Sequence, residues 1–451
     1  MFDKAILVLR GVGQIAAFLS AMLSRSISFR LKLLRHSLTS STAPPAGEPL
    51  NIVIIGASIA GYHAASTIAA NLPPWLGYRV VVVEPRDHFH FTWVLPRFCV
   101  VEGHEHKAFI PYAGHLPAGS LDDGPGGAPS KVAWVRDRVA SISPTAVRLA
   151  AGGADIPYAF LVVATGAGAG DALPNRVPAD GKAEGLELLR RMQARIRDAA
   201  DLVVVGGGAA GVELATDAKS KYPDKRVTLV HSRDAVMHRF GPRLQAAARD
   251  GIDALGVRLV TGDRVVSEDK DRRVAVLKSG REIPCDCLIN CTGQRPDARL
   301  VAALSPASVS ATTGHVLVRP TMQVRDPALP NVYACGDVCA PDPEEDSTAV
   351  VAQPNSRSAM RQAMVAAFNV LDAAEGRAPS NVYRPNWFDG VIKLTLGLDK
   401  SVSSVGDGKT ELLFRAKDKD VALMVDGVWK RLGATPFEDD DTFLSKVKTK
   451  I

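Results

Sequence analysis

Short apolar runs rich in β-branched residues alternate with alanine-rich stretches along much of the chain. The run at 51–55 is typical of a strand, and a glycine-containing turn follows it to residue 61. Alanine-rich sequence to residue 70 then predicts a helix, and the apolar run at 79–83 predicts a second strand. This order of strand, turn, helix and strand is that of a parallel βαβ unit.

The turn of this unit, GASIAG, has the spacing of a dinucleotide site. Gly56 permits the tight turn, Gly61 lets helix and strand pack closely, and the helix N-terminus faces a pyrophosphate. Ser58 stands in the middle, where glycine usually allows a closer approach of the backbone. The second strand ends in Glu84, which can accept hydrogen bonds from an adenosine ribose. The predicted contacts in the turn are Gly56, Ala57, Ser58, Ile59, Ala60 and Gly61.

A second copy of the pattern lies at 202–234, and here all three turn glycines are present. Its predicted nucleotide contacts are Gly206, Gly207, Gly208, Ala209, Ala210 and Gly211. We expect Glu213 in the first helical turn, where a negative charge favours the helix dipole. The strand after the helix ends before His231 rather than an acid, and Arg233 can meet a 2′-phosphate. The second site therefore predicts use of NADPH as well as NADH.

Four further segments return towards these turns. A strand is expected at 134–142, and another at 158–164 leads into Thr165-Gly166. A strand at 285–291 leads into Thr292-Gly293, and one at 331–335 into Gly336-Asp337. Residues 347–371 read as a helix apart from Pro354, with an N-terminus that can face a flavin ring. The last 70 or so residues predict a small domain or cap of short strands and turns.

Charge and cysteine content exclude some classes of function. The net charge is +6, and residues 1–48, with six Lys and Arg against two Asp and Glu, carry +4 of it. The remaining +2 argues against a broad nucleic-acid surface. The six cysteines form no C-x-x-C pair, which favours buried thiols over a disulfide framework. His88, His90, His104 and His106 lack the acid or Cys spacing of a metal site, so no metal is predicted.

The N-terminus predicts a targeting or membrane element. Residues 5–23 are long and apolar enough to cross a bilayer, interrupted by Arg10 and Gln14. These two residues share one helical face, which also fits an interfacial helix. The Ser- and Arg-rich, acid-poor sequence to residue 41 is typical of mitochondrial import, and a disordered tail is the alternative. We expect a membrane-associated mitochondrial protein, or one on the cytoplasmic face of another membrane or on a lipid droplet.

The ordered set GASIAG, Glu84, ATG, GGGAAGVE, CTG and CGD resembles the two-dinucleotide flavoproteins that oxidise pyridine nucleotides. Within them, DHFHF, PRFCVVEG, KAFIPY and VTLVHS are most similar to the apoptosis-inducing-factor-like group. The resemblance covers about residues 49–400. It implies FAD, NADH or NADPH as cofactors and, for the ferroptosis-suppressor (AMID-type) members, a quinone as the electron acceptor. The myristoylation signal of some members is missing, since Phe2 follows Met1.

The resemblance also assigns residues. It places FAD on the first turn and on Glu84, with Arg97, Val139 and Asp337 as further contacts, and it places Glu213, the predicted catalytic residue, near the nicotinamide. Other predicted cofactor contacts are Lys107, Thr165, Gly166, His231, Arg233, Gly293 and Gly336.

The expected fold is α/β, with two Rossmann-like domains arranged as in glutathione reductase and a small C-terminal α+β domain. The expected boundaries are a targeting segment and linker at 1–48, an FAD domain from 49–175 and 312–380, an NAD(P)H domain at 176–311, and a C-terminal domain at 381–451. The sequence leaves the oligomeric state open.

Three functions fit a chain with two nucleotide sites. The first is NAD(P)H:quinone oxidoreduction, in which the cofactor carries the chemistry. A dithiol reductase needs a Cys pair after the first unit and a C-terminal His, but Cys99 stands alone there and the last His is His315. The third is a redox-sensing scaffold with a death-signalling or nucleic-acid partner, which the near-neutral body disfavours. The sequence therefore favours the quinone reductase.

Overall fold

The computed structural model describes two groups of residues. Most of the chain is covered by 48–123, 130–168, 173–345, 354–407, 409–418, 420–439 and 443. Nearer the N-terminus the described residues are 6, 7, 9–14, 16, 20, 24, 27, 30, 31, 34, 35 and 38.

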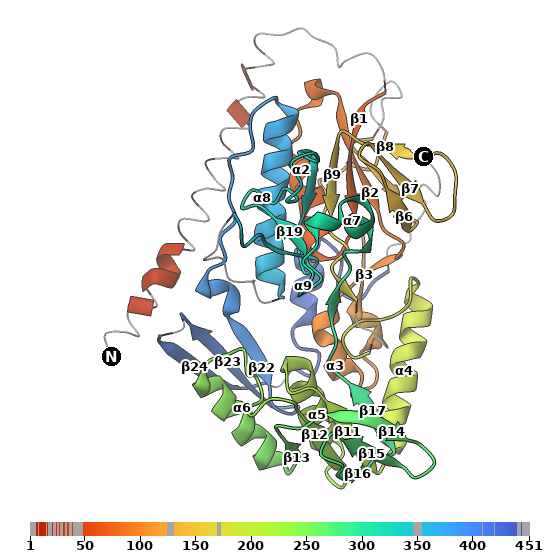
Figure 1. The fold of residues 1–451 in the computed structure, drawn as a ribbon, viewed down its shortest axis with the longest axis vertical. Coiled ribbons are helices and arrows are strands. Elements are labelled where there is room, and N and C mark those ends of the chain that lie inside the picture. The colour runs from red at the N-terminus through yellow and green to blue at the C-terminus, as the bar shows by residue number, and fades with distance from the viewer. Residues whose placement is uncertain are drawn as a thin grey trace.

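The first predicted βαβ unit lies at the centre of a five-stranded parallel sheet (Figure 1). Its strands, in spatial order, are β20 (Val332–Ala334), β9 (Phe160–Val163), β1 (Leu50–Ile55), β2 (Tyr78–Val83) and β5 (Val132–Val135). Helix α2 (Ile59–Asn71) follows β1 and packs against α8 (Ser356–Ala374). The sheet thus combines strands from both predicted parts of the FAD domain, although they are far apart in sequence.

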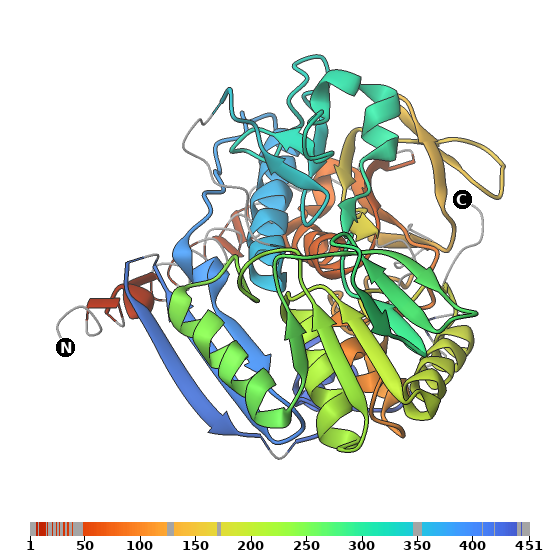
Figure 2. The ribbon, with the colours of Figure 1, turned by 60° about the horizontal axis from the view of Figure 1, so that its bottom comes forward.

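The second copy forms a four-stranded parallel sheet, which Figure 2 shows in the lower half of the molecule. The strand order is β13 (Arg258–Val260), β12 (Arg226–Val230), β11 (Asp201–Val205) and β17 (Cys287–Asn290). Its helices are α4 (Lys182–Asp198), α5 (Ala209–Lys221) and α6 (Pro242–Leu255). Two parallel sheets, each with a glycine turn between its first strand and helix, confirm the predicted α/β class.

The described part of the chain also forms three three-stranded antiparallel sheets. They are β6 (Val139–Ile142) with β7 (Ala146–Leu149) and β8 (Ile156–Pro157); β14 (Val265–Asp269) with β15 (Val274–Leu277) and β16 (Glu282–Pro284); and β22 (Ile392–Thr395) with β23 (Lys400–Gly406) and β24 (Glu411–Lys417). The last sheet lies beside α6, and α9 (Val425–Arg431) follows it.

The remaining elements are short. They are η1 (Pro74–Leu76), β3 (His88–His90), η2 (Thr92–Val94), α3 (Leu95–Phe98), η3 (Glu105–Ala108), β4 (Phe109–Pro111), β10 (Ala167–Gly168), β18 (Arg295–Pro296), α7 (Arg299–Leu304), η5 (Pro306–Ser308), β19 (Val316–Val318), β21 (Cys339–Pro341) and η6 (Trp387–Gly390).

Two predicted elements differ from the structure. The strand expected at 134–142 is two strands, β5 and β6, in different sheets, because the polar segment Arg136–Arg138 interrupts the apolar pattern between them. The helix expected from residue 347 begins at Ser356, where the Asn355 side chain accepts hydrogen bonds from two backbone N–H groups of the first turn. Residues 347–353 of that prediction lie outside the described residues.

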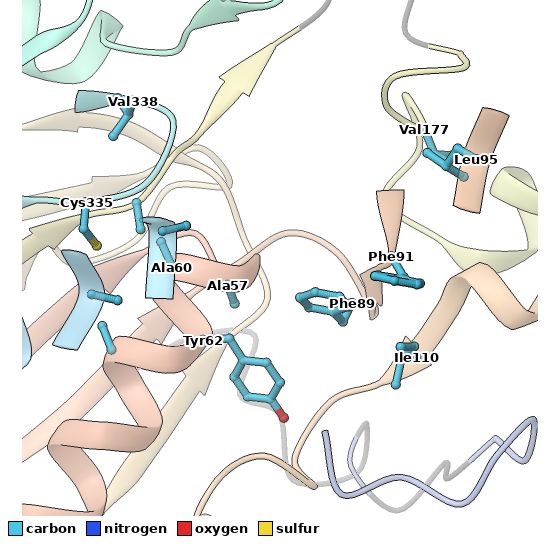
Figure 3. Close-up of a cluster of buried hydrophobic side chains, with 14 of the residues drawn as sticks. Ala57, Ala60, Tyr62, Phe89, Phe91, Leu95, Ile110, Val177, Cys335 and Val338 are labelled. Atoms are coloured by element: carbon cyan, nitrogen blue, oxygen red, sulfur yellow. The ribbon is translucent and has the colours of Figure 1, made fainter. Parts of the chain in front are cut away.

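Apolar side chains from both ends of the first unit fill the core beneath its turn. Figure 3 shows Phe89 between Ala57 of the turn and Ile110 of β4, with Phe91 beside it. Phe89 is 2% exposed and Ile110 is fully buried. This packing fixes the segment after β2 against the first turn.

A buried ion pair joins the two halves of the molecule. Arg97 of α3 donates from Nε to Oδ2 of Asp217 on α5 over 2.6 Å, and both side chains are almost completely buried. Its Nη2 donates to the carbonyl of Gly397, after β22. Burial raises the pKa of Asp217 to about 6, and the Arg97 charge opposes that rise. One guanidinium therefore contacts the second parallel sheet's helix and the C-terminal sheet together.

The predicted membrane segment, 5–23, is described in part. Residues 5, 8, 15, 17–19 and 21–23 lie outside the described residues. None of the helices in the described parts of the chain has both the length and the hydropathy needed to span a bilayer. Arg10 lies 3.5 Å from Asp407 of the C-terminal part, and Leu7 is 1% exposed.

Replacing Arg97 with Met removes a buried charge partner, and we expect it to lower the free energy of unfolding by about 3–5 kcal/mol. The loss arises because Asp217 is left buried and uncompensated. Urea unfolding followed by tryptophan fluorescence measures it. The double variant R97M/D217L should recover most of the loss.

The control is R272A, which breaks the exposed Arg272–Glu282 pair and should cost less than about 1 kcal/mol. Equal losses for R97M and R272A would contradict a special role for the buried pair.

Candidate functional site

The first glycines of the two turns adopt a conformation that other residues avoid. Gly56 has φ +91° and Gly206 has φ +113°. A Cβ on Gly56 would lie 2.7 Å from the Ala164 carbonyl oxygen, and one on Gly206 would lie 2.7 Å from Thr292. Both contacts are with the segment that follows the neighbouring strand, so the ATG and CTG motifs are packed directly against the turns.

The last glycines bring each helix onto its strand. A Cβ on Gly61 would lie 1.8 Å from the carbonyl oxygen of Gly56, and one on Gly211 would lie 1.8 Å from that of Gly206. No side chain fits at these distances, because nonbonded carbon and oxygen atoms repel strongly there. The two turns are therefore equivalent in construction as well as in sequence.

The middle position has a different requirement. Ser58 has φ −75° and ψ −164°, and Gly208 has φ −80° and ψ −176°, so both are extended and open to any residue. A Cβ on Gly208 would meet no atom within 4 Å in the part of the chain that the structure describes, apart from its neighbours in sequence. The space in front of this position is thus left for a ligand, as a pyrophosphate cradle requires.

Glu84 holds the first turn in place. Its Oε2 accepts a hydrogen bond from the Ala57 backbone N–H at 2.7 Å, and its Oε1 accepts one from the Arg86 N–H at 3.0 Å. The side chain is 2% exposed. The predicted ribose acceptor is therefore also part of the support of the turn.

A cavity of about 630 Å³ opens in front of the first turn. Its walls come from residues 58–60, 86, 90–93, 112, 138, 164–168, 176–180, 294, 297, 336–337, 354–357, 359 and 391–393. The first turn, the ATG segment, the Gly336-Asp337 segment and the start of α8 thus face one space, although they are spread over about 300 residues of sequence.

The structure brings together only some of the predicted FAD contacts. Those that line the cavity are Ser58, Ile59, Ala60, Thr165, Gly166, Gly336 and Asp337. Gly56, Ala57, Gly61 and Glu84 lie in or beneath the turn, outside the lining. All of these assignments stay predictions.

Three other predicted contacts lie away from the cavity. Arg97 is in the buried ion pair described above, and Val139 begins β6. Lys107 Nζ donates to His104 Nδ1 over 2.8 Å and lies 4.6 Å from the centroid of the Phe437 ring. Their roles as cofactor contacts also stay predictions.

Several polar groups at the cavity wall were not found from the sequence. Both ring nitrogens of His90 are buried without a hydrogen-bond partner in the described part of the chain, as is Nε of Arg86 and of Arg357. Burial lowers the pKa of His90 to about 3 and lowers the pKa of Arg357. Buried donors without partners fit a ligand with phosphate and carbonyl oxygens, such as FAD. The sequence signal for His90 was its place between Phe89 and Phe91 in an aromatic run.

Asp337 faces this cavity beside a cation. Arg176 Nη2 lies 3.4 Å from Asp337 Oδ2. Burial raises the pKa of Asp337, and the Arg176 charge opposes that rise. A carboxylate at this place can accept hydrogen bonds from ligand hydroxyl groups.

Several residues predicted to contact the second nucleotide lie near the second turn. The Gly207 N–H donates to His231 Nδ1 at 3.0 Å, and Arg233 is exposed two residues beyond. Gly293 has φ +84° and follows Thr292, which packs against Gly206. Gly207, Gly293 and His231 thus lie around one turn, and their contacts with NAD(P)H stay predictions.

Glu213 differs from the prediction in position and charge. It is the fifth residue of α5, whose first turn has no acidic residue, so it does not complement the helix dipole there. Its Oε1 accepts a hydrogen bond from the Thr395 N–H of β22 at 3.0 Å. Desolvation raises its pKa from 4.5 to about 8, so the side chain is neutral at pH 7. Its catalytic role stays a prediction.

The two nucleotide segments meet in a short ribbon. β10 pairs antiparallel with β18, and these strands follow the ATG and CTG motifs. Thr165 Oγ1 donates to the Asp297 carbonyl at 2.7 Å, and the Asp297 N–H donates to the Gly166 carbonyl at 2.9 Å. The predicted FAD and NAD(P)H sites are therefore connected by hydrogen bonds at their glycine motifs.

Comparison with known proteins gives matches over nearly the whole chain. The sequence profile of the pyridine nucleotide-disulphide oxidoreductase family matches residues 50–367. Fe-regulated protein 8 of Mycosarcoma maydis is 32% identical over 88% of this chain and 98% of its own length. Ferroptosis suppressor protein 1 of Homo sapiens is 26% identical over 86% of this chain and 97% of its own length.

Among solved structures, the sulfide:quinone oxidoreductase of Aquifex aeolicus is similar, with a TM-score of 0.66 and 16% identity. The alignment covers 85% of this chain and 92% of that protein. This likeness concerns the fold. The relatives named ferroptosis suppressor protein confirm the resemblance drawn from the motifs.

Replacing Glu213 with Gln tests its neutral state. A carboxyl with a raised folded-state pKa is protonated in the folded chain and ionised in the unfolded chain between pH 4.5 and about 8. Its contribution to stability is therefore lost as the pH rises through this window. Gln cannot ionise, so E213Q should gain about 4 kcal/mol over the wild type between pH 4.5 and 8.

Urea unfolding at pH 5, 6.5 and 8 measures this difference. A free-energy difference between E213Q and wild type that stays constant with pH would show that Glu213 is ionised in the folded chain.

Proposed function

This chain belongs to the pyridine nucleotide-disulphide oxidoreductase family, and from that premise we propose that it is an NAD(P)H:quinone oxidoreductase. Members of the family are flavoproteins that use FAD with NADH or NADPH, as the doubled turns predicted. The proposed overall reaction takes NAD(P)H, a proton and a quinone to NAD(P)⁺ and the quinol. Bound FAD and NAD(P)H supply the hydride and electron transfer.

One observation carries the proposal: the cavity in front of the first turn has an apolar side as well as a polar one. Phe91, Trp93, Val391 and Ile392 line it together with the predicted FAD contacts. Trp93 is 50% exposed, which is unusual for so large an apolar side chain. An aromatic ring at the rim of a cofactor cavity suits a flat, apolar acceptor such as a quinone.

The protein's own groups position and shield the site. His90, which lines the cavity, is neutral, and both of its ring nitrogens are buried without a hydrogen-bond partner in the described part of the chain. Arg176 and Arg357 add positive charge on the side of Asp337 and α8. Phe91 and Trp93 add apolar surface to the lining. This division favours electron transfer to an apolar acceptor over proton chemistry by side chains.

The thiols support a direct route to the acceptor. All six cysteines are free, and Cys99, the one nearest in sequence to the first unit, is completely buried. Burial raises its pKa well above the ordinary range, which disfavours the reactive thiolate. We therefore propose electron transfer without a redox-active disulfide.

We further propose that the N-terminal segment attaches the protein to a membrane surface, in keeping with the predicted mitochondrial location. Leu7 and Gly11 are buried, and Gly11 lies next to Trp387 of the C-terminal part. Leu9 and Val12, on the opposite side of a helix, are 70% and 60% exposed. A helix with one face on the protein and an apolar face outwards fits an interfacial anchor.

The proposed reaction is tested by NADH and NADPH oxidation with and without a water-soluble quinone. A quinone should stimulate oxidation by the wild type at least about tenfold, whereas a scaffold would show no stimulation. G208D places a carboxylate against the pyrophosphate at an open, extended position, so it should lower NAD(P)H oxidation at least about 100-fold and keep FAD bound. G208A, which adds a Cβ in the same open space, is the control for the backbone change.

Membrane attachment is tested by flotation with anionic vesicles. L9E/V12E places two charges on the exposed apolar face and should reduce the bound fraction at least about tenfold. V266E, at a residue of β14 that is 57% exposed, is the matched control. Flotation that is the same for both variants would refute the anchor.

A further inference from the structure

The loop after β12 is fastened onto the second turn through one residue, Gly207. Its N–H donates to His231 Nδ1 at 3.0 Å, and its carbonyl accepts a hydrogen bond from the Met237 N–H at 2.7 Å. A Cβ on Gly207 would lie 2.7 Å from His231 Cγ, so the imidazole packs closely against the turn. A change at His231 therefore acts on the nucleotide turn directly.

The hydrogen bonds fix the tautomer of His231. Because Nδ1 accepts from Gly207, the proton of a neutral ring must be on Nε2. This Nε2 lies 3.2 Å from Nδ1 of His238, so it donates and His238 accepts. The chain from Gly207 through His231 to His238 is complete when both rings are neutral. An extra proton on either Nδ1 leaves two N–H groups facing each other and breaks the chain.

The charged groups around this pair are mostly cations. On the same loop they are Arg233, Asp234 and Arg239, and the β13–β14 connection adds Asp263, which interacts with Arg281 of the β15–β16 hairpin. Asp263 is held by the Ser279 hydroxyl at 2.5 Å and by the Arg264 N–H at 2.8 Å. Its backbone N–H donates to the His231 carbonyl. His231 is buried, whereas His238 is exposed and able to meet a ligand.

We propose that His238, through its bond with His231, makes the preference for NADPH over NADH depend on pH, by taking up a proton when a 2′-phosphate binds. The inference rests on the proposed function, because it requires the second turn to bind NAD(P)H. The adenosine ribose of such a nucleotide lies at the end of the second strand, where His231 stands. A 2′-phosphate there accepts the Nδ1–H that His238 gains on protonation, which His231 cannot accept because its Nε2 already carries a proton, whereas the 2′-hydroxyl of NADH offers no charge for it.

The direction of the effect follows from linkage. In the free protein, burial and then the neighbouring cationic groups lower the pKa of both His231 and His238. A bound 2′-phosphate favours the imidazolium and raises the pKa of His238. The affinity for a 2′-phosphate ligand therefore rises as the pH falls from the pKa of His238 in the complex to its pKa in the free protein. The affinity for the unphosphorylated analogue does not change over this interval.

The test uses the full-length, FAD-loaded protein with 2′,5′-ADP and 5′-ADP as probes, so no turnover is needed. Calorimetric titrations at pH 6.5 and 8.0 give the ratio of the two affinities, and two buffers of different ionisation enthalpy give the protons taken up. For the wild type we expect this ratio to rise about fivefold at pH 6.5, with proton uptake for 2′,5′-ADP alone.

Two variants make the outcome specific. H238Q keeps an acceptor for the His231 N–H but cannot titrate, so the ratio of its affinities for 2′,5′-ADP and 5′-ADP should change less than about twofold between the two pH values. Any change that remains in H238Q measures the titration of the ligand phosphate itself near pH 6. H106Q, on η3 where His106 contacts Phe437, should keep the wild-type rise.

A wild-type ratio that is constant with pH, a rise that persists in H238Q, or binding of neither probe would overturn the inference. If 2′,5′-ADP binds with proton uptake but quinone does not stimulate NAD(P)H oxidation, this inference is supported and the proposed quinone acceptor is overturned instead.

Discussion

The buried ion pair between Arg97 and Asp217 is the constraint on which the arrangement of this molecule depends. A charge in the protein interior must be paired, so α3, which follows the first βαβ unit, is held against α5 of the second. The same guanidinium bonds the Gly397 carbonyl, and Glu213, on the α5 turn before Asp217, bonds the Thr395 N–H. The two nucleotide turns and the C-terminal sheet are thereby fixed relative to one another. Electron transfer between two cofactors requires such a fixed geometry.

The two nucleotide turns on either side of this junction are built in the same way. In both turns the last glycine brings helix onto strand, and the first glycine packs against the segment after a neighbouring strand. The two sites differ in what surrounds them. The first opens into a cavity lined by Asp337, cationic side chains and aromatic rings, whereas the second is covered by a loop with two histidines.

The sequence determined the repeated part of this protein. Gly56, Gly61, Gly206 and Gly211 are dictated by local sterics, since the turn they form lies within a few residues of chain. The strands β1, β2, β11 and β12 follow from short β-branched runs, and the motifs after β9, β17 and β20 mark where the chain returns. The period of the hydrophobic pattern and the spacing of the glycines are local properties, and a single sequence contains them in full. The family resemblance rested on these motifs and was correct for the same reason.

The tertiary structure alone decided which residues of the irregular segments meet. Arg97 and Asp217 are 120 residues apart, and nothing in the spacing of either predicts a partner that far away. His90, Phe91 and Trp93 lie in one aromatic run, but their place at a cavity depends on residues 354–357 and on β22. Glu213 was predicted to be charged from its helix position, but its burial favours the neutral form, because desolvation raises its pKa to about 8. Contacts between distant segments depend on the packing of the whole chain, and the energies that shift the pKa of a side chain arise from those contacts.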